Sequence, residues 1–320
     1  MITVKSNKTK VNDLIFKELI KRGYSLDGNT RIWNIADSKL WYLTPNQSQA
    51  FLDLENSECY QKEIIQKEID LIKNDLNEIL EKIGEDPLNI IDLGCGDGKK
   101  AALFLEKLKI KSKIRYCPID ISGYMVEKAI SKITKLGVGE VVEFQWNISD
   151  FENMGNITSL LRQGKFKKNL ILLLGNTLGN FEINELLYGV RRAMSEGDFL
   201  LVGNGLNNQN EKDILKSYDT IEVNEFLIHI PLQLGLTEED VKLKVRFINS
   251  RVELYYVLQK DKKIIFQDKS VRFNEGDQII VSVSYKYNEY DFKSFLNIYF
   301  HEVNMSVSPD GSYGLALCKK

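Results

Sequence analysis

The chain has 320 residues, with 43 lysines and arginines against 45 aspartates and glutamates, and a formal charge of −2. Near-neutral charge argues against a protein held to nucleic acid by a basic field. Two histidines, His229 and His301, cannot build a three-histidine zinc site, so we expect no metal. The four cysteines form no C-x-x-C pair, and we find neither an N-terminal apolar signal core nor a membrane-spanning stretch. Composition therefore predicts a cytoplasmic protein.

The first predicted element is a helix before Pro87. Apolar residues recur at alternating spacings of four and three over residues 65–83, which places one apolar stripe on a charged helix, and Gly84 suits its C-cap. The stripe could be a coiled-coil seam. It spans fewer than three heptads and runs directly into a strand, however, so packing against the following domain is favoured.

Short apolar runs alternate with helical patterns from residue 89 onward. Strands are predicted at 89–94, 115–120, 141–147, 169–175 and 199–203, and helices at 99–108, 123–136, about 157–163 and 184–194. Parallel strands need crossover connections, so the alternation predicts an α/β fold with a doubly wound parallel sheet. Pro118 donates nothing to a ladder and is tolerated only because it lies at the carboxyl end of its strand.

The alternation stops after Gly203. Residues 206–281 mix helical and strand-like runs, including 242–258 and 262–272. The tail returns to strand character at 302–308 and 313–319, on either side of a Pro-Asp-Gly-Ser turn, which predicts an antiparallel hairpin that completes the sheet.

Two domains are expected from this organisation. The main domain comprises residues 61–205 plus 288–320. Residues 1–60 plus 206–287 form a second lobe, where we expect substrate choice to reside.

A glycine-rich loop, Asp92-Leu93-Gly94-Cys95-Gly96-Asp97-Gly98, closes the first strand of the alternating region. Glycines let the backbone turn tightly and approach a ligand that a Cβ would block. The spacing is not the G-x-G-x-x-G of a dinucleotide fold, and the G-x-x-x-x-G-K-[ST] phosphate cradle is missing, so NAD and P-loop nucleotides are disfavoured. Taken alone, the loop could be an ordinary glycine-rich turn.

Acidic residues follow the next two strands. Asp120 ends the second strand, where a carboxylate accepts hydrogen bonds from a ribose diol. Asp150 and Phe151 follow the third strand and supply an acid and a ring for the edge and face of an adenine. With the glycine loop, these residues predict a nucleoside pocket at the carboxyl ends of the strands.

These motifs, with the C-terminal antiparallel strand pair, resemble those of class I S-adenosylmethionine-dependent methyltransferases. The resemblance implies S-adenosylmethionine as cofactor and S-adenosylhomocysteine as its product. It places Gly94 and Gly96 near the methionine part, Asp120 at the ribose, and Asp150 and Phe151 at the adenine.

The acceptor is indicated by the segment after the fourth strand, Gly175-Asn176-Thr177-Leu178-Gly179-Asn180-Phe181. It lacks the N-P-P-Y-like sequence of DNA amino-methyltransferases. It is similar to the G-S-T-I-G-N-F segment of the histidine-specific methyltransferase family, whose members trimethylate the α-amine of histidine toward ergothioneine or act on prenylated tryptophan. Further matches follow in order along nearly the whole chain: Tyr42, Phe51, Glu58-Cys59-Tyr60, Lys100, Ser217-Tyr218-Asp219 and Ser282-Val283-Ser284-Tyr285-Lys286-Tyr287.

That family resemblance implies roles for matching residues. Tyr60, Asn180 and Tyr218 would hold the carboxylate of an amino acid with neutral donors. Thr177 and neighbouring carbonyls would orient its amine. Displacement at a methyl already activated by a sulfonium requires alignment more than a strong base, so we name no catalytic base.

Three further matches have less defined roles. Tyr42 would route the amine proton through water, with a ring packed in the core of the lobe as the alternative. Lys100 would belong to the cofactor site, and Phe51 to the substrate site.

The sequence departs from the family at the side-chain pocket. Where histidine enzymes have E-V-S, with the glutamate and serine holding the imidazole, this chain has Ser282-Val283-Ser284, and Leu254 replaces a methionine. Period-two alternation places Ser282, Ser284 and Lys286 on one face of the strand. Because loss of a charge-assisted hydrogen bond costs about 1.5–3 kcal/mol, we expect an amino acid with a neutral, larger or aromatic side chain.

Two alternatives remain at this stage. One is histidine N-α-methylation itself, and the other is a non-catalytic protein that binds S-adenosylmethionine. The intact glycine loop and Asn180 argue against decay of the site. The expected partner is a small-molecule amino acid, not nucleic acid or membrane, and the expected state is a monomer or weak dimer.

Overall fold

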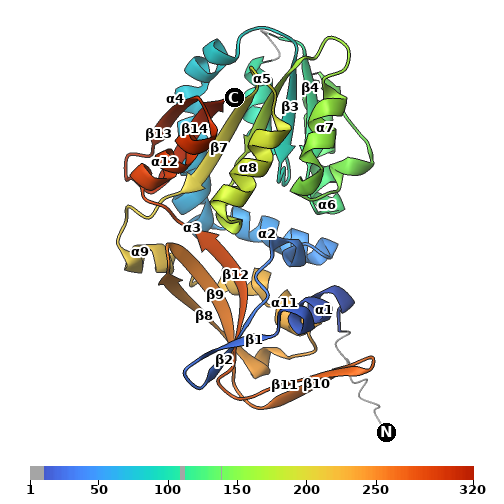
Figure 1. Ribbon diagram of the computed structural model, residues 1–320, viewed down its shortest axis with the longest axis vertical. Coiled ribbons are helices and arrows are strands. Elements are labelled where there is room, and N and C mark those ends of the chain that lie inside the picture. Colours follow the sequence, from blue (N-terminus) through green and yellow to red (C-terminus); the bar gives the residue numbers. More distant parts are fainter. Residues whose placement is uncertain (1–10, 109–111, 138) are drawn as a thin grey trace.

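The computed structural model describes residues 11–108, 112–137 and 139–320. The segment 1–10, part of the N-terminus in which the sequence shows no signal core, lies outside the described residues. The described chain forms a seven-stranded sheet, a five-stranded sheet and a separate two-stranded ribbon. Figure 1 shows the two larger sheets stacked along the long axis, with helix α2 (Pro45–Asn56) between them.

The seven-stranded sheet has the order β13-β14-β7-β6-β3-β4-β5. Its strands are β3 (Leu88–Leu93), β4 (Ile114–Ile119), β5 (Glu140–Val141), β6 (Lys168–Leu173), β7 (Phe199–Gly205), β13 (Glu302–Val307) and β14 (Tyr313–Lys319). Strands β3 to β7 pair in parallel, whereas β14 pairs antiparallel with both β7 and β13. The predicted doubly wound sheet with a C-terminal antiparallel hairpin is confirmed.

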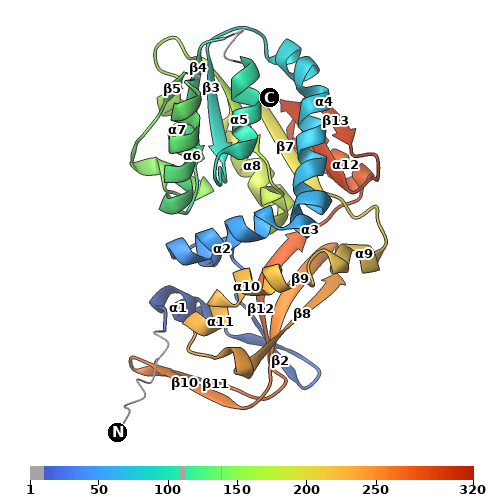
Figure 2. The same cartoon turned by 180° about the vertical axis from the view of Figure 1, so that it is seen from behind.

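Helices cover both faces of this sheet (Figures 1 and 2). One face carries α4 (Gln66–Ile83), α5 (Lys99–Leu108) and α6 (Gly123–Leu136), and the other carries α7 (Met154–Leu161), α8 (Ile183–Ala193) and α12 (Glu289–Tyr299). The order of strands reverses between β3 and β6, because the chain goes from β3 out to β5 and then returns to the opposite side of β3. Ligands bind at such switch points in open α/β sheets.

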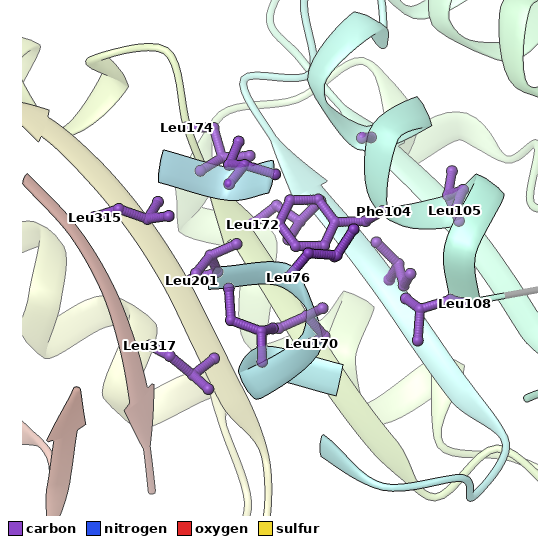
Figure 3. Close-up of a cluster of buried hydrophobic side chains, with 14 of the residues drawn as sticks. Leu76, Phe104, Leu105, Leu108, Leu170, Leu172, Leu174, Leu201, Leu315 and Leu317 are labelled. Atoms are coloured by element: carbon purple, nitrogen blue, oxygen red, sulfur yellow. The ribbon is translucent and has the colours of Figure 1, made fainter. Parts of the chain in front are cut away.

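The apolar stripe of α4 packs against the sheet. Leu76 lies among Phe104, Leu172 and Leu201 in the core cluster shown in Figure 3. Gly84 caps the helix with a φ of 82°. The predicted packing against the following domain is confirmed, and the coiled-coil alternative is wrong because the stripe is buried.

The prediction of a strand over 141–147 is wrong. β5 ends at Val141, and a 3-10 turn occupies Gln145–Asn147. The Asn147 side chain accepts from the Phe144 N–H at 2.6 Å and donates to the Pro118 carbonyl at 2.7 Å. These local bonds replace the ladder that a strand would have formed at this edge of the sheet. Pro118 lies next to the last residue of β4, as expected.

The five-stranded sheet has the order β1-β2-β12-β9-β8. Its strands are β1 (Tyr24–Asp27), β2 (Thr30–Asn34), β8 (Val241–Ile248), β9 (Arg251–Leu258) and β12 (Gln278–Tyr285), and the ribbon is β10 (Lys262–Phe266) with β11 (Lys269–Phe273). Strands β8 and β9 are joined by Asn249 and Ser250, both with positive φ (51° and 55°), which is the geometry of a tight hairpin turn.

Short helices complete this part of the chain. They are α1 (Asp13–Arg22), η1 (Ser38–Trp41), α3 (Glu58–Tyr60), α9 (Glu211–Lys216), α10 (Ile221–Leu227) and α11 (His229–Gln233). The five-stranded sheet, α1, α10 and η1 share one apolar core, separate from the two cores of the seven-stranded sheet. Of the helices in the described ranges, none is long and apolar enough to cross a lipid bilayer.

Candidate active site

A cavity with an empty volume of about 1440 Å³, its open mouth included, lies at the carboxyl ends of β3, β4 and β6, against the five-stranded sheet. Every residue that the sequence assigned to the site lines this cavity: Tyr42, Phe51, Tyr60, Gly94, Gly96, Lys100, Asp120, Asp150, Phe151, Thr177, Asn180, Tyr218, Leu254, Ser282 and Ser284.

The glycine loop brings the backbone close to two neighbouring segments. Gly94 and Gly96 have φ values of 68° and 51°, which side chains rarely adopt. A Cβ on Gly94 would lie 3.1 Å from the Thr177 side chain. The Gly96 N–H donates to Asp120 Oδ2 at 3.2 Å, which links the ends of β3 and β4. The loop therefore forms the wall between the Asp120 end and the Thr177 end of the cavity.

Two buried carboxyls stand at the ends of β3 and β4. Burial raises the pKa of Asp120 to about 6, although N–H donors from Ser122 and Gly96 oppose the shift. Burial also raises the pKa of Asp92 to about 7, opposed by the Tyr116 hydroxyl, which donates to Asp92 Oδ2 at 2.8 Å. Asp120 remains an acceptor for hydroxyl donors at neutral pH.

Lys100 lies in a buried charge network. Its Nζ is 3.1 Å from Glu55 Oε1 and 3.7 Å from Glu68 Oε2. Burial lowers the pKa of Lys100, but the two carboxylates outweigh burial and leave it raised. Glu68, which is fully buried, also accepts from the Gly175 N–H at 2.9 Å and the Tyr313 hydroxyl at 2.6 Å. The network connects α2, α4, α5 and the end of β6.

The end of the cavity where we expect the adenine is covered by η1, a helix of the N-terminal residues. Lys39, from η1, donates to Asp150 Oδ2 at 3.0 Å. The ring of Phe151 lies 5.4 Å from that of Phe181, measured between centroids. Sequence reasoning did not select Lys39, because only the packing of the two sheets brings η1 beside residue 150.

The segment after β6 forms a 3-10 turn, η5 (Thr177–Asn180). Asn176, before this turn, has a left-handed φ of 63°; its Oδ1 accepts from the Gly205 N–H at 2.8 Å, and its Nδ2 donates to Ser284 Oγ at 3.1 Å. Thr177 Oγ1 donates to the Leu174 carbonyl at 2.7 Å. Within the part of the chain that the structure describes, the Asn180 side chain makes no hydrogen bond, and it faces the cavity. Its amide is available to a ligand.

The five-stranded sheet contributes the far end of the cavity. Ser282 lies opposite Leu254 in the β12–β9 pair. The Tyr218 hydroxyl donates to Ser284 Oγ at 2.9 Å. Ser284 Oγ therefore accepts two hydrogen bonds, from Tyr218 and Asn176, and its own proton is available to the cavity.

Aromatic rings form a wall beside Ser282. Phe226, on α10, lies between the rings of Trp41, Tyr42 and Phe51, at centroid distances of 6.2, 5.9 and 5.3 Å. The Tyr42 ring packs in this wall, and its hydroxyl has no hydrogen-bond partner among the described residues. Burial raises the pKa of Tyr42 well above its ordinary value. The ring of Tyr42 thus packs in the core of the lobe, and the routing of the amine proton through its hydroxyl stays a prediction.

The residues missed by sequence reasoning share one property: their partners are remote in the chain. Glu55, Glu68, Asn176 and Phe226 reach the site only through packing of helices and loops. Asn176 lies in the segment that follows the fourth predicted strand. The sequence signal for its role is that asparagine adopts a left-handed φ more readily than most residues.

An open parallel sheet, a closing antiparallel strand pair and a cavity with Asp120 and Asp150 at its switch point define the class: an S-adenosylmethionine-dependent methyltransferase. The chain belongs to the histidine-specific, S-adenosylmethionine-dependent methyltransferase family, whose model matches residues 48–320. It is an enzyme, and S-adenosylmethionine is its cofactor. No curated protein sequence matches the chain.

Three solved structures resemble that of the chain, each at low sequence identity. The PH0226 protein from Pyrococcus horikoshii OT3 is 13% identical, over 86% of this chain and 99% of that one, with a TM-score of 0.45. Magnesium protoporphyrin IX methyltransferase (ChlM) from Synechocystis PCC 6803, with bound S-adenosylhomocysteine, is 12% identical over 87% and 96%, with a TM-score of 0.45. A family 2 O-methyltransferase from Planctomyces limnophilus DSM 3776 is 12% identical over 87% and 62%, with a TM-score of 0.40.

Proposed function

We propose that the enzyme transfers a methyl group from S-adenosylmethionine to the α-amine of an amino acid whose side chain is uncharged and apolar or aromatic. Residues 61–205 plus 288–320 bind the cofactor in this proposal. Residues 1–60 plus 206–287 select the acceptor. The free thiols of the four cysteines support an enzyme that works in the reducing cytoplasm. In this proposal the enzyme is a monomer or weak dimer.

The observation that carries the proposal is the composition of the side-chain end of the cavity. Phe51, Phe226 and Leu254 line it together with Ser282, which replaces the family's glutamate. Glu55, the carboxylate that α2 contributes to the cavity, is already paired with Lys100 at 3.1 Å. An imidazolium would find no free carboxylate here, whereas an apolar or aromatic side chain would bury its surface against the rings.

The polar end of the same cavity supports recognition of the amino-acid backbone. Tyr60 and Asn180 supply neutral donors for a carboxylate, and their side chains have no hydrogen-bond partner within the described ranges. Tyr218 contributes through Ser284, since its hydroxyl donates to Ser284 Oγ and leaves the Ser284 proton available to the cavity. Burial raises the pKa of Tyr60 above its ordinary value, so its hydroxyl stays protonated and able to donate. Thr177 and the backbone carbonyls of the η5 segment would orient the amine beside the glycine loop.

The chemistry requires a neutral amine in line with the sulfonium. The amine lone pair forms the new C–N bond as the C–S bond breaks, and the sulfonium leaves as the neutral thioether of S-adenosylhomocysteine. The amine then loses one proton to water, for which the half-buried Tyr42 hydroxyl offers a route. S-adenosylmethionine supplies the activated methyl, and the residues of the chain align the two reactants.

A methylation screen tests the proposal. The enzyme is incubated with S-adenosylmethionine and each free amino acid, and products are measured by mass spectrometry together with S-adenosylhomocysteine release. Methylation of an apolar or aromatic amino acid, with histidine used at least about tenfold less efficiently, is expected from the lost charge-assisted bond. Asn180→Ala, whose side chain bonds no other described residue, should abolish most turnover while retaining cofactor binding. Histidine as the preferred substrate, or no transfer to any amino acid, would contradict the proposal.

A further inference from the structure

Lys286, the residue after β12, is a buried cation beside the substrate end of the cavity. Its side chain is 6% exposed. Among the residues in the described ranges, no carboxylate lies within 4.0 Å of its Nζ, and its ammonium makes no hydrogen bond. The partly buried Lys100 contrasts with it, since two carboxylates hold that ammonium. A lysine with so little exposure and no counter-ion gives its surroundings a positive potential, which an anion in the neighbouring cavity would neutralise.

The surroundings of Lys286 locate the ammonium. A Cβ on Gly205 would lie 2.2 Å from Lys286 Nζ and 3.3 Å from Asn176 Oδ1. The ammonium therefore lies against the backbone at the end of β7, next to Asn176, and only glycine leaves room for it. Figure 1 shows the same place, where the end of β12 reaches the seven-stranded sheet.

A carboxylate beside the same strand, Glu68, is already engaged. Two residues before Gly205, a Cβ on Gly203 would lie 2.4 Å from Glu68 Oε1. Glu68, however, accepts from the Gly175 N–H and the Tyr313 hydroxyl and is 3.7 Å from Lys100. Glu68 thus belongs to the Lys100 network and makes no ion pair with Lys286.

Between Lys286 and the cavity stand two groups that can transmit its charge. The Lys286 Nζ lies 5.5 Å from the centroid of the Tyr218 ring, within the range of a cation–π interaction. The Tyr218 hydroxyl donates to Ser284 Oγ at 2.9 Å, and Asn176 Nδ2 donates to the same oxygen at 3.1 Å. Tyr218 and Ser284 line the cavity, whereas Lys286 does not. A cation at the ring makes the phenolic hydroxyl a stronger donor.

We propose that Lys286 is the positioning residue that makes the acceptor site selective for a carboxylate. It acts through Tyr218 and Ser284 and supplies the positive potential that the neutral donors lack. This inference rests on the proposed function, since it assigns the anion to the carboxylate of the amino-acid acceptor. Hydrogen bonds from neutral donors are already stronger to a carboxylate than to a carboxamide, and a fixed positive charge adds to that preference for the carboxylate.

The test compares Lys286→Met with the wild-type enzyme on matched pairs of acceptors. L-Phenylalanine, L-tryptophan and L-leucine are each paired with their primary amides, and kcat and KM are measured at saturating S-adenosylmethionine. In Lys286→Met the ratio of kcat/KM for acid over amide should fall by about tenfold, mainly through KM. Lys286→Arg, which keeps the charge, should retain more of the preference. Lys263→Met, at an exposed lysine on β10, is the matched control and should leave the ratio unchanged.

The ratio of kcat/KM for acid over amide distinguishes a role of Lys286 in selectivity from a general loss of folded enzyme. Loss of folded protein lowers kcat/KM for acid and amide equally, so it leaves the ratio unchanged. An unchanged ratio in Lys286→Met, with the wild type methylating an amino acid, would overturn the role of Lys286 and leave the proposed function standing. If the wild type methylates no amino acid and calorimetry with S-adenosylhomocysteine detects no binding of the acids, both proposals fail together.

Discussion

Ser282 is the single residue on which the choice of acceptor depends most directly. It lies opposite Leu254 on β9 and lines the cavity. In the histidine enzymes that this chain resembles, a glutamate holds the imidazole at this place. A serine is shorter than a glutamate and carries no charge, so it offers no ionised partner at this position.

Ser282→Glu should therefore increase the use of histidine. A charge-assisted hydrogen bond is worth about 1.5–3 kcal/mol, so kcat/KM for histidine should rise about tenfold or more, while that for apolar amino acids falls. Ser282→Gln has nearly the same shape without the charge and is the matched control. Equal histidine turnover in the two variants would show that the charge at this position does not select the acceptor.

The carboxyl of Asp120 predicts how cofactor binding depends on pH. Its pKa of about 6 means that it is ionised, and a full acceptor for the ribose hydroxyls, only above that pH. Because protonation removes acceptor capacity, the affinity for S-adenosylhomocysteine should fall as pH drops through 6, approaching about tenfold per unit below it. Isothermal titration calorimetry from pH 5 to 8 measures this. Asp120→Asn should bind weakly with a flat profile, whereas Asp92→Asn should keep the dependence; a flat wild-type profile would contradict the role.

How far individual residues could be predicted depended on where their partners lie. Gly94, Asp120 and Asn180 are parts of short motifs at strand ends, and the topology alone carries them to one cavity; their roles stay predictions. Lys39 and Glu68 come from outside any motif, and their partners are more than one hundred residues away along the chain. Such pairs depend on how two sheets pack, which a one-dimensional pattern does not specify.

Helix α4 has one face exposed to solvent and one face buried in the core. Its exposed face is charged, while Ile72 is fully buried against the sheet and Lys73 points outward. The same spacing that could have formed a coiled coil is satisfied within the chain, because strands β14 and β7 offer an apolar face of matching width.

Ile72→Ala should lower the free energy of unfolding by about 2–5 kcal/mol, because it leaves a cavity in a close-packed core. Urea denaturation followed by circular dichroism measures this. Lys73→Ala, one residue along the helix, should change stability by less than about 0.5 kcal/mol. If Ile72→Ala instead altered the oligomeric state and not the stability, the stripe would be an interface and not a core.

Elements with regular local signals were predicted well, and elements fixed by edges and turns were not. Helix α6 and strand β14 have clear periodicity and were predicted at their observed bounds. The third strand was overextended because Asn147 diverts the chain with its own side-chain hydrogen bonds. The sequence pattern over 242–272 does not separate the individual strands, since their hairpins depend on turns such as Asn249-Ser250 that carry no glycine.

At the scale of the whole molecule, α2 joins the two sheets. Ser48 on α2 and Ser122 before α6 share a buried hydrogen bond of 2.7 Å, and the Tyr124 hydroxyl donates to Gln49 at 2.6 Å. Phe51 and Glu55 on the same helix face the cavity. One helix thus contacts the start of α6, beside the seven-stranded sheet, and also lines the cavity.

Cofactor binding should therefore stabilise both parts of the chain. Hydrogen–deuterium exchange with S-adenosylhomocysteine should slow in the glycine loop, residues 92–98, and also in α2. The β10–β11 ribbon lines no part of the cavity and should exchange unchanged, as the internal control. Protection limited to the glycine loop would show that α2 is not coupled to the cofactor.

The wall shared by Gly94 and Thr177 has a consequence for inhibition. A Cβ on Gly94 would come within 3.1 Å of Thr177, so the glycine loop and the segment after β6 approach each other at this point of the cavity wall. A compound in which the nitrogen of an aromatic amino acid replaces the sulfur-bound methyl would span that point and occupy both halves at once. Tethering makes the second binding event intramolecular. The tethered amino acid then has an effective concentration in the millimolar range at its site. The selectivity of such a bisubstrate compound among methyltransferases would come from the half of the cavity lined by Ser282 and Phe226, where we propose that the acceptor binds.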